Sequence, residues 1–229
     1  MEQLRVNNQR ASIAKIFLGF MCFLSFVMMV NHIIIYNILI DIEDQSALAD
    51  DYIMFFGIPL GLNVFAQFGY VIGLIVTGIL FIKWMRRAYY NLKLKVDYLG
   101  YSESETVWSW FIPFLNWVRP YQIMSELFLE LRQYLQKNGQ EIKDNSFMVN
   151  IWWGLWVVNN VLNTITSKLY TLEETVEKLK TGTAVEIFSS AVSIIAALLA
   201  IKMISYYNEM ETKMIDTSSE AEEGNISLA

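Results

Sequence analysis

The chain has 229 residues, of which 55% are hydrophobic and 17% are charged, and its net charge is −6. Soluble proteins of this length carry more charge on their surfaces, so the composition predicts an integral membrane protein of the all-α class. One cysteine and one histidine exclude an internal disulfide framework and a metal-ligand cluster, so we expect no metal and no cofactor.

Four apolar segments are predicted to be transmembrane helices: residues 16–40, 64–82, 147–165 and 184–204. The first would be about 37 Å long as a helix, which is enough to cross a bilayer with some tilt. A cleaved signal peptide is the alternative, because residues 47–49 resemble a cleavage site. The hydrophobic core of a signal peptide is shorter, however, and Asp41, Glu43 and Asp44 precede that site, so we predict a retained span.

The distribution of basic residues predicts the orientation of these spans. Lysine and arginine are concentrated before residue 16 and between residues 83 and 143, whereas the loop of residues 41–51 is acidic and has no basic residue. Because basic residues favour the cytoplasmic side, both termini and the long middle segment are expected inside the cell. Residues 53–62 are apolar but contain Gly57, Pro59 and Gly61, so they are expected at the interface or entering the bilayer at an angle.

Two of the predicted spans carry stripes of small side chains. Small residues allow two helices to approach closely, so each stripe is a predicted helix-packing face. The residues are Gly69, Gly73 and Thr77 in the second span, and Ser189, Ser193 and Ala197 in the fourth.

The segment of residues 107–118 is apolar and aromatic but too short to cross a bilayer. It would be roughly 18 Å long as a helix, against about 30 Å of hydrocarbon. Pro113 removes a backbone donor in its middle, and Pro120 disfavours helical geometry at Arg119. We therefore expect a re-entrant or interfacial segment on the cytoplasmic side, with residues 107–137 at the membrane surface.

An amphipathic helix is expected to follow. Its apolar face collects Met124, Leu127, Phe128, Leu131 and Leu135. Such a helix lies along lipid head groups or packs on a helix bundle. Residues 1–207 are therefore interpreted as a single membrane domain, and the polar, acidic tail of residues 208–229 is expected to be disordered.

Several short motifs resemble a known family. Residues 110–124 read WFIPFLNWVRPYQIM and resemble the signature of a family of bacterial four-helix membrane proteins catalogued only as a domain of unknown function. Residues 87–92 (RAYYNL) and residues 152–156 (WWGLW) are similar to elements of the same family. The resemblance implies a four-helix architecture and, together with the basic-residue asymmetry, a bacterial plasma membrane. It implies no activity.

Arg119 is the first candidate site residue, with Asn116 and Tyr121 close to it in the chain. A guanidinium group binds phosphate or carboxylate, so these residues are candidates for holding an anionic lipid head group or a substrate anion. The alternative is structural: Arg119 pairs with a nearby carboxylate or extends to lipid phosphates, and so fixes the depth of the segment. The nearby carboxylates are Glu103, Glu105 and Glu126.

A second candidate group lies within the predicted spans. It consists of Asn159, Asn160, Asn163 and Thr164 in the third span and His32 in the first. Polar side chains in a bilayer mark a transport pathway or hydrogen bonds between helices. No aspartate or glutamate adjoins the asparagines in the sequence, which favours hydrogen bonds between helices. For His32, a bond to a neighbouring helix is likewise favoured over a proton relay.

Three functions are compatible with these features. The first is a non-enzymatic or regulatory membrane component that assembles with itself or with a membrane-protein partner. The second is a small transporter or channel subunit that uses the polar third span. The third is an enzyme acting on lipid head groups, but no catalytic motif is recognisable and no catalytic residue is assigned. The expected partners also include the lipid bilayer and an anionic lipid, and exclude nucleic acid.

Overall fold

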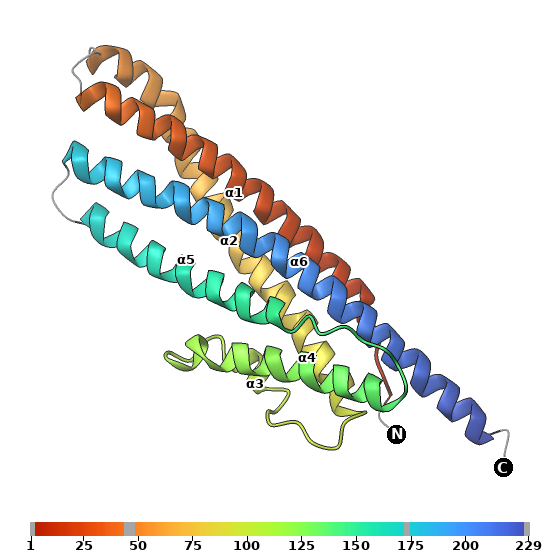
Figure 1. Cartoon of the computed structure of the whole chain (residues 1–229). Helices are drawn as coiled ribbons and strands as arrows, with labels where there is room; N and C mark the ends of the chain where they lie inside the picture. Colours follow the sequence, from red (N-terminus) through yellow and green to blue (C-terminus); the bar gives the residue numbers. More distant parts are fainter. Residues whose placement is uncertain (1–2, 44–48, 172–174, 227–229) are drawn as a thin grey trace. The chain divides into compact units, whose positions relative to one another are not determined.

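The computed structural model describes residues 3–43, 49–171 and 175–226. Helices form the regular structure of these residues, and their order can be followed in Figure 1. The elements are α1 (Asn8–Glu43), α2 (Ala49–Lys93), α3 (Glu105–Trp108), the 3-10 helix η1 (Leu115–Trp117), α4 (Arg119–Lys137), α5 (Phe147–Thr171) and α6 (Val176–Ile226).

Three of these helices are long and apolar enough to cross a membrane. They are α1, the part of α2 from Gln67 to Lys93, and the part of α6 from Val176 to Ser218. The chain is therefore an all-helical membrane protein with three candidate spans among its described residues. α5 has 25 residues but is not one of these candidates. The fourth span, in α5, stays a prediction.

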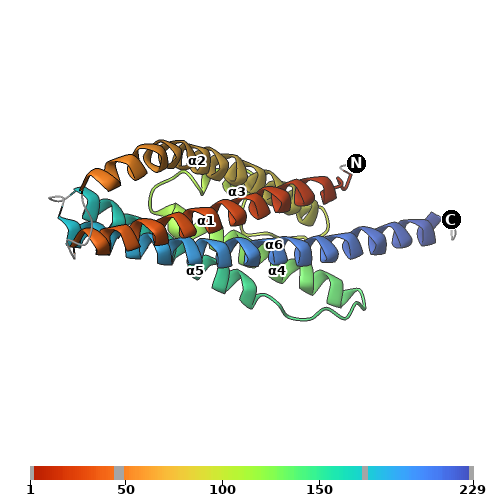
Figure 2. The same ribbon diagram turned by 90° about the horizontal axis from the view of Figure 1, so that it is seen from above.

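α2 differs from the expectation for residues 49–62. It begins at Ala49 and continues without a break to Lys93, past Gly57, Pro59 and Gly61. Figure 2 shows this helix as one continuous ribbon. Proline already has a helical φ angle and removes one backbone hydrogen bond, and apolar helices in membranes tolerate that loss. The separate interfacial segment at residues 53–62 is therefore corrected to the first part of α2.

α6 also extends further than the sequence indicated. It runs from Val176 to Ile226, so residues 208–226 are helical where a disordered tail was expected. Met210 and Met214 are almost completely buried, and so is the charged side chain of Glu211. These side chains lie at helical spacing among many charges, which hides the periodicity in the sequence. The correction covers the part of the tail that the structure describes.

The contacts of the chain divide it into two compact units. Unit 1 contains residues 3–16, 78–153 and 199–226, and unit 2 contains residues 17–43, 49–77, 154–171 and 175–198. Several helices contribute to both units. Each unit has an interior of its own, and the two interiors differ in chemistry.

Unit 1 has an apolar interior. The five apolar side chains expected on one face of α4 are all buried, together with Trp84, Met203 and Ile204. A chain of aromatic contacts crosses this core, with ring centroids 5.3–5.6 Å apart: Trp152 to Phe81, Phe81 to Trp84, Trp84 to Tyr207, and Tyr207 to Phe128. Burial of this kind is the main stabilising term in a protein that packs in water.

Unit 2 has polar side chains in its interior and large apolar side chains on its surface. Its buried side chains include Ser25, His32, Thr77, Thr166, Thr183 and Ser189. Its exposed side chains include Phe20, Phe23, Ile33, Phe68, Ile72, Phe188 and Ile195. Exposed apolar side chains around polar interior contacts are the arrangement that lipid favours, because lipid cannot satisfy polar groups.

The segment before α4 is open and aromatic. It consists of α3, a turn, and η1, and Trp108, Phe111, Phe114 and Trp117 are all exposed. Phe114 is 87% exposed and has a φ of 65°, which is unfavourable for a bulky side chain. We call residues 108–118 the aromatic edge. Pro120 lies in the first turn of α4, where its missing N–H is not needed.

Candidate functional sites: a basic cavity and a polar pocket

A cavity of about 480 Å³ in unit 1 is lined by five cationic side chains. They are Arg5 and Arg10 from the N-terminal segment and Lys83, Arg86 and Arg87 from α2. Glu103 is the carboxylate among the described lining residues, and its Oε1 accepts a hydrogen bond of 2.7 Å from Arg86 Nε. We call this site the basic cavity.

Among the described residues, the other four cations of the lining form no direct ion pair with a carboxylate, although Glu103 acts on Arg87 through its charge. Arg10 donates to the backbone oxygen of Lys83 at 3.2 Å. The guanidinium groups of Arg5 and Arg87 lie 4.4 and 5.9 Å from the centroid of the Tyr90 ring, which reduces their mutual repulsion. Gathered cations of this kind bind phosphate or carboxylate groups by charge-assisted hydrogen bonds.

A buried polar network holds the N-terminal segment against α2 and α6. Asn91 accepts from the backbone N–H of Arg5 at 3.0 Å and donates to its carbonyl at 2.7 Å. Glu211 is 1% exposed and accepts from Asn91 Nδ2 at 2.7 Å and from Asn7 Nδ2 at 3.0 Å. The network therefore fixes the backbone of Arg5 next to the α2 residues of the basic cavity.

A second network positions the loop that carries Glu103. The Tyr89 hydroxyl accepts from the Tyr101 N–H at 3.0 Å and lies 2.9 Å from Glu126 Oε2, to which it can donate. The other oxygen of Glu126 accepts from the Gly100 N–H at 2.6 Å. Residues 100 and 101 are thereby tied to α2 and α4, and Glu103 follows them at the cavity.

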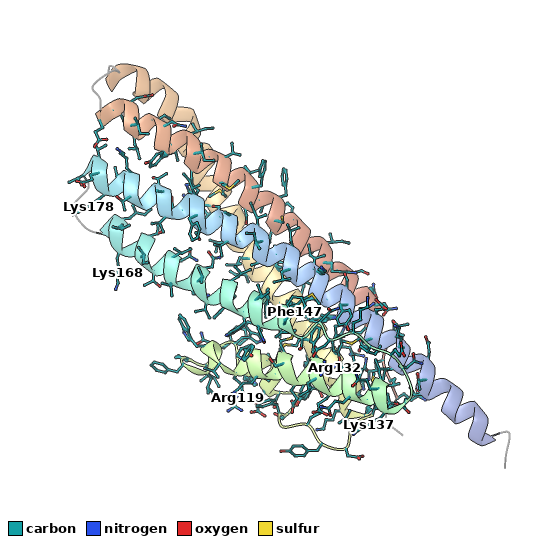
Figure 3. All side chains as sticks on the ribbon, viewed as in Figure 1. Arg119, Arg132, Lys137, Phe147, Lys168 and Lys178 are labelled. Carbon is teal, nitrogen blue, oxygen red and sulfur yellow. The ribbon has the colours of Figure 1, made fainter. Side chains whose placement is uncertain are left out.

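Arg119, the first candidate from the sequence, lies at the start of α4 (Figure 3). Its Nη1 is 4.0 Å from Glu105 Oε1, and its guanidinium lies 5.0 Å from the centroid of the Tyr101 ring. Hydrogen bonds from the Ser102 N–H and hydroxyl lower the pKa of Glu105 below its ordinary value, and Arg119 adds to this effect. Arg119 is therefore in contact with one of the carboxylates considered for its structural role.

Asn116 and Tyr121 do not form one site with Arg119. The Tyr121 hydroxyl donates to Asn150 Oδ1 at 3.0 Å, and its ring lies 6.2 Å from that of Trp153. Asn116 Oδ1 is buried and has no hydrogen-bond partner among the described residues. The three residues lie close in sequence but face different surroundings.

In unit 2, a pocket of about 170 Å³ collects polar side chains from four helices. His32 Nδ1 lies 3.0 Å from Glu186 Oε2, and the same oxygen accepts from the Tyr170 hydroxyl at 2.8 Å. Asn159 Oδ1 accepts from the Ser189 hydroxyl at 2.5 Å, and Asn159 Nδ2 donates to Ser193 Oγ at 2.8 Å. Asn163 Oδ1 is 3.3 Å from the Ser189 hydroxyl. We call this site the polar pocket.

The remaining two polar candidates of the third predicted span lie outside this pocket. Asn160 donates to the backbone oxygen of Trp156 at 2.8 Å, and Thr164 donates to the backbone oxygen of Asn160 at 2.9 Å. Both bonds join residues one turn apart within α5. Asn160 and Thr164 thus donate to backbone oxygens of their own helix, whereas His32, Asn159 and Asn163 line one pocket with Glu186.

The RAYYNL motif contributes to the basic cavity through Arg87 and to the two networks beside it through Tyr89 and Asn91. Residues 61–209 match the family described as a domain of unknown function, DUF4328. The chain belongs to the DUF4328 family. The expectation of an uncharacterised family is thus confirmed. Comparisons with curated proteins and with solved structures gave no match.

The small-residue stripes of this DUF4328 chain contact helices of the same unit. A Cβ atom on Gly73 would lie 2.8 Å from the sulfur of Met21 in α1, and Thr77 is buried. Ser189 and Ser193 bond Asn159 of α5, and Ala197 is 9% exposed. Around Gly69, in contrast, nothing lies within 4 Å of a Cβ atom. Most of the two stripes is therefore used inside unit 2.

Two DUF4328 site features were missed by reasoning from the sequence. The N-terminal arginines and the basic end of α2 were used to predict orientation, but nothing local in the sequence joins them into one cavity. Glu186 was also missed, although a signal existed: residues 186, 189, 193 and 197 share one face of a helix. The match to DUF4328 covers Glu186 and the α2 part of the basic cavity, while Arg5 and Arg10 precede it.

Proposed function

We propose that this protein is a non-enzymatic, multi-pass component of the bacterial plasma membrane that binds the phosphate of an anionic lipid in its basic cavity. The observation that carries the proposal is the gathering of five cations around one carboxylate in a cavity of about 480 Å³. A phosphodiester head group supplies the negative charge and the acceptor oxygens that such a lining requires.

The composition of unit 1 supports the predicted topology. Unit 1 unites the N-terminal segment, the middle segment and the end of α6, which are the three parts that the basic-residue distribution assigns to the cytoplasmic side. The predicted spans of residues 16–40 and 64–82 form one pair between these parts, and those of residues 147–165 and 184–204 form a second pair. Two pairs correspond to four spans, with α5 as the additional one.

The aromatic edge supports a position of unit 1 at the lipid surface. Tryptophan is favoured at the membrane interface, and exposed phenylalanine is favoured deeper in the lipid. Trp108, Phe111 and Trp117 are exposed in the segment that leads into the amphipathic helix α4. An inner-leaflet location of this edge would place these exposed apolar side chains against lipid.

Assembly through the small-residue stripes has less support than lipid binding, because most of those residues contact helices of the same unit. A role as a small transporter or channel subunit is the second candidate function. It is favoured by one observation, the joining of His32 and Glu186 in the polar pocket.

The test is lipid retention by the purified protein. Native mass spectrometry in mild detergent is used with equal amounts of phosphatidylglycerol and phosphatidylcholine. The wild type is expected to retain phosphatidylglycerol. A double variant, Arg10→Gln with Arg87→Gln, is expected to bind it about 30-fold more weakly, since each cation near a lipid phosphate contributes about 1 kcal/mol and 1.4 kcal/mol is a factor of ten.

Lys93→Gln is the matched control, because Lys93 is an exposed cation of the same helix that does not line the cavity. It is expected to leave retention unchanged. Equal retention by the double variant and the wild type would contradict the proposal, and loss in Arg119→Gln alone would move the site to the start of α4. Displacement of the lipid by inorganic phosphate would identify a free anion as the ligand.

A further inference from the structure

The polar pocket contains an ionisable pair within helices whose outer surfaces are apolar. His32 is 7% exposed and Glu186 lies opposite it on α6, with 3.0 Å between Nδ1 and Oε2. The ring N–H is not aligned for a hydrogen bond at this distance, since Nδ1 has no hydrogen-bond partner among the described residues. The attraction between His32 and Glu186 is therefore between opposite charges, and it requires that His32 carries a proton on each ring nitrogen.

Loss of that proton changes the charge of the pocket. With His32 protonated, the imidazolium and the Glu186 carboxylate compensate one another. With His32 neutral, the carboxylate keeps a full negative charge beside apolar helix surfaces. A carboxylate in such surroundings favours a nearby positive charge, so a second cation can replace the proton.

The pocket offers oxygen ligands for such a cation. Asn159, Asn163, Ser189 and Ser193, which carry amide and hydroxyl oxygens, line it together with Glu186. Hard cations prefer carboxylate, amide and hydroxyl oxygens over nitrogen and sulfur ligands. A volume of about 170 Å³ exceeds the roughly 30 Å³ of one water molecule several-fold, so a partly hydrated ion fits.

We propose that the polar pocket is a binding site for a monovalent cation such as Na⁺, which takes the place of the proton on His32. The exchange is balanced: the pocket with imidazolium and carboxylate takes up one Na⁺ and releases one H⁺, leaving neutral imidazole and a carboxylate that contacts Na⁺. A single compensating charge suits a monovalent ion, because the described lining has one carboxylate.

Other titratable groups near the pair are tyrosines and one separate ion pair. Tyr70 of α2 lines the pocket, and Tyr170 of α5 donates to Glu186. On α1, Tyr36 lies one turn beyond His32, and Glu43 pairs with Lys180 of α6. Glu43 and Lys180 compensate one another, so His32 and Glu186 are the pair whose charges the cation would rebalance.

The chain contains one histidine, which makes the test direct. Protein purified through a tag without histidine is labelled with ¹⁵N-histidine, placed in lipid nanodiscs and titrated by NMR in NaCl or in choline chloride at equal ionic strength. The midpoint of the imidazole titration is expected at lower pH in NaCl. One-for-one competition moves it by up to about one pH unit per tenfold increase in Na⁺.

Glu186→Gln is expected to abolish the difference between the two salts. Ser189→Ala, which keeps the charge and removes one oxygen ligand, is expected to reduce it and serves where Glu186→Gln fails to fold. Glu177→Gln is the matched control, because Glu177 is an exposed carboxylate in the first turn of the same helix. Identical wild-type titrations in NaCl and choline chloride would overturn the proposal, as would a full Na⁺ effect in Glu186→Gln.

Discussion

Asn91 of α2 and Glu211 of α6 are joined by a buried hydrogen bond of 2.7 Å from Nδ2 to Oε1, across 120 positions of the sequence. Both side chains are at most 1% exposed. Asn91 also holds the backbone of Arg5, and Glu211 also accepts from Asn7. One buried carboxylate therefore connects α6, α2 and the N-terminal segment that supplies two arginines to the basic cavity.

The first prediction concerns this carboxylate. Glu211→Ala removes the acceptor for two buried amide donors, and each unsatisfied donor lowers the free energy of unfolding by about 1–3 kcal/mol. We expect a total loss of about 3 kcal/mol, measured as a lower midpoint of thermal unfolding by tryptophan fluorescence in mild detergent. Glu209→Ala is the control, since Glu209 is exposed and pairs with Lys213 on the same helix. Similar midpoints for the two variants would show that the network contributes little.

The second prediction concerns the loop before α3. Tyr89→Phe removes the hydroxyl that accepts from the Tyr101 N–H and lies beside Glu126. If the free energy of local opening at Tyr101 falls by about 1.4 kcal/mol, its opening equilibrium constant rises tenfold. Hydrogen–deuterium exchange at Tyr101 is therefore expected to be about tenfold faster. Tyr98→Phe is the control, because Tyr98 is 79% exposed in the same connection. Unchanged exchange at Tyr101 in Tyr89→Phe would rule out the hydroxyl as the restraint.

The sequence was sufficient for features that depend on local periodicity. The membrane class follows from long apolar runs, and the buried face of α4 follows from the spacing of Met124, Leu127, Phe128, Leu131 and Leu135. The resemblance to an uncharacterised family was read from short motifs, RAYYNL and the segment around Pro113, and the match of residues 61–209 to DUF4328 confirms the family. These features are encoded within one or two helical turns.

The candidate sites depend on contacts between distant helices, which one sequence does not specify. Arg5 meets α2 through the bonds of its backbone to Asn91, 86 positions away, and through the ring of Tyr90. His32 meets Glu186 only after α1 and α6 pack together in unit 2. The hydrogen bonds of Asn159 to Ser189 and Ser193 agree with the expectation of bonds between helices, whereas the carboxylate of the same pocket comes from α6 and could not be placed from the sequence.

The third prediction concerns pH. Asp144 accepts from the Ser146 hydroxyl at 2.6 Å and from its N–H at 3.0 Å, and it pairs with Arg132 of α4. These contacts lower the pKa of Asp144 to about 2, with the Ser146 bonds as the larger cause. Because the folded-state pKa is lowered, the stabilisation is present above the unfolded value of about 3.9 and is lost as the pH falls towards 2.

Thermal unfolding of the wild type and of Asp144→Asn is the corresponding measurement. The wild type is expected to have the higher midpoint near pH 6, and the difference is expected to shrink between about pH 4 and pH 2. Asp97→Asn is a control in a different loop. A difference that persists unchanged at pH 2 would mean that the charge of Asp144 is not the cause.

The last prediction concerns the aromatic edge. Phe114 is 87% exposed and has a φ of 65°. This conformation is unfavourable for a bulky side chain, and such conformations are found where the position of the side chain has a function. Contact with the acyl region of the inner leaflet is such a function, because burying the ring in lipid contributes about 2 kcal/mol. A fluorophore at Phe114→Cys, in a Cys22→Ala background, is therefore expected to show blue-shifted emission in nanodiscs and quenching by brominated lipids. Gln140→Cys, exposed in the loop after α4, is the matched control and is expected to report water. Equal emission at the two positions would place the edge outside the lipid and leave the strained φ of Phe114 without this explanation.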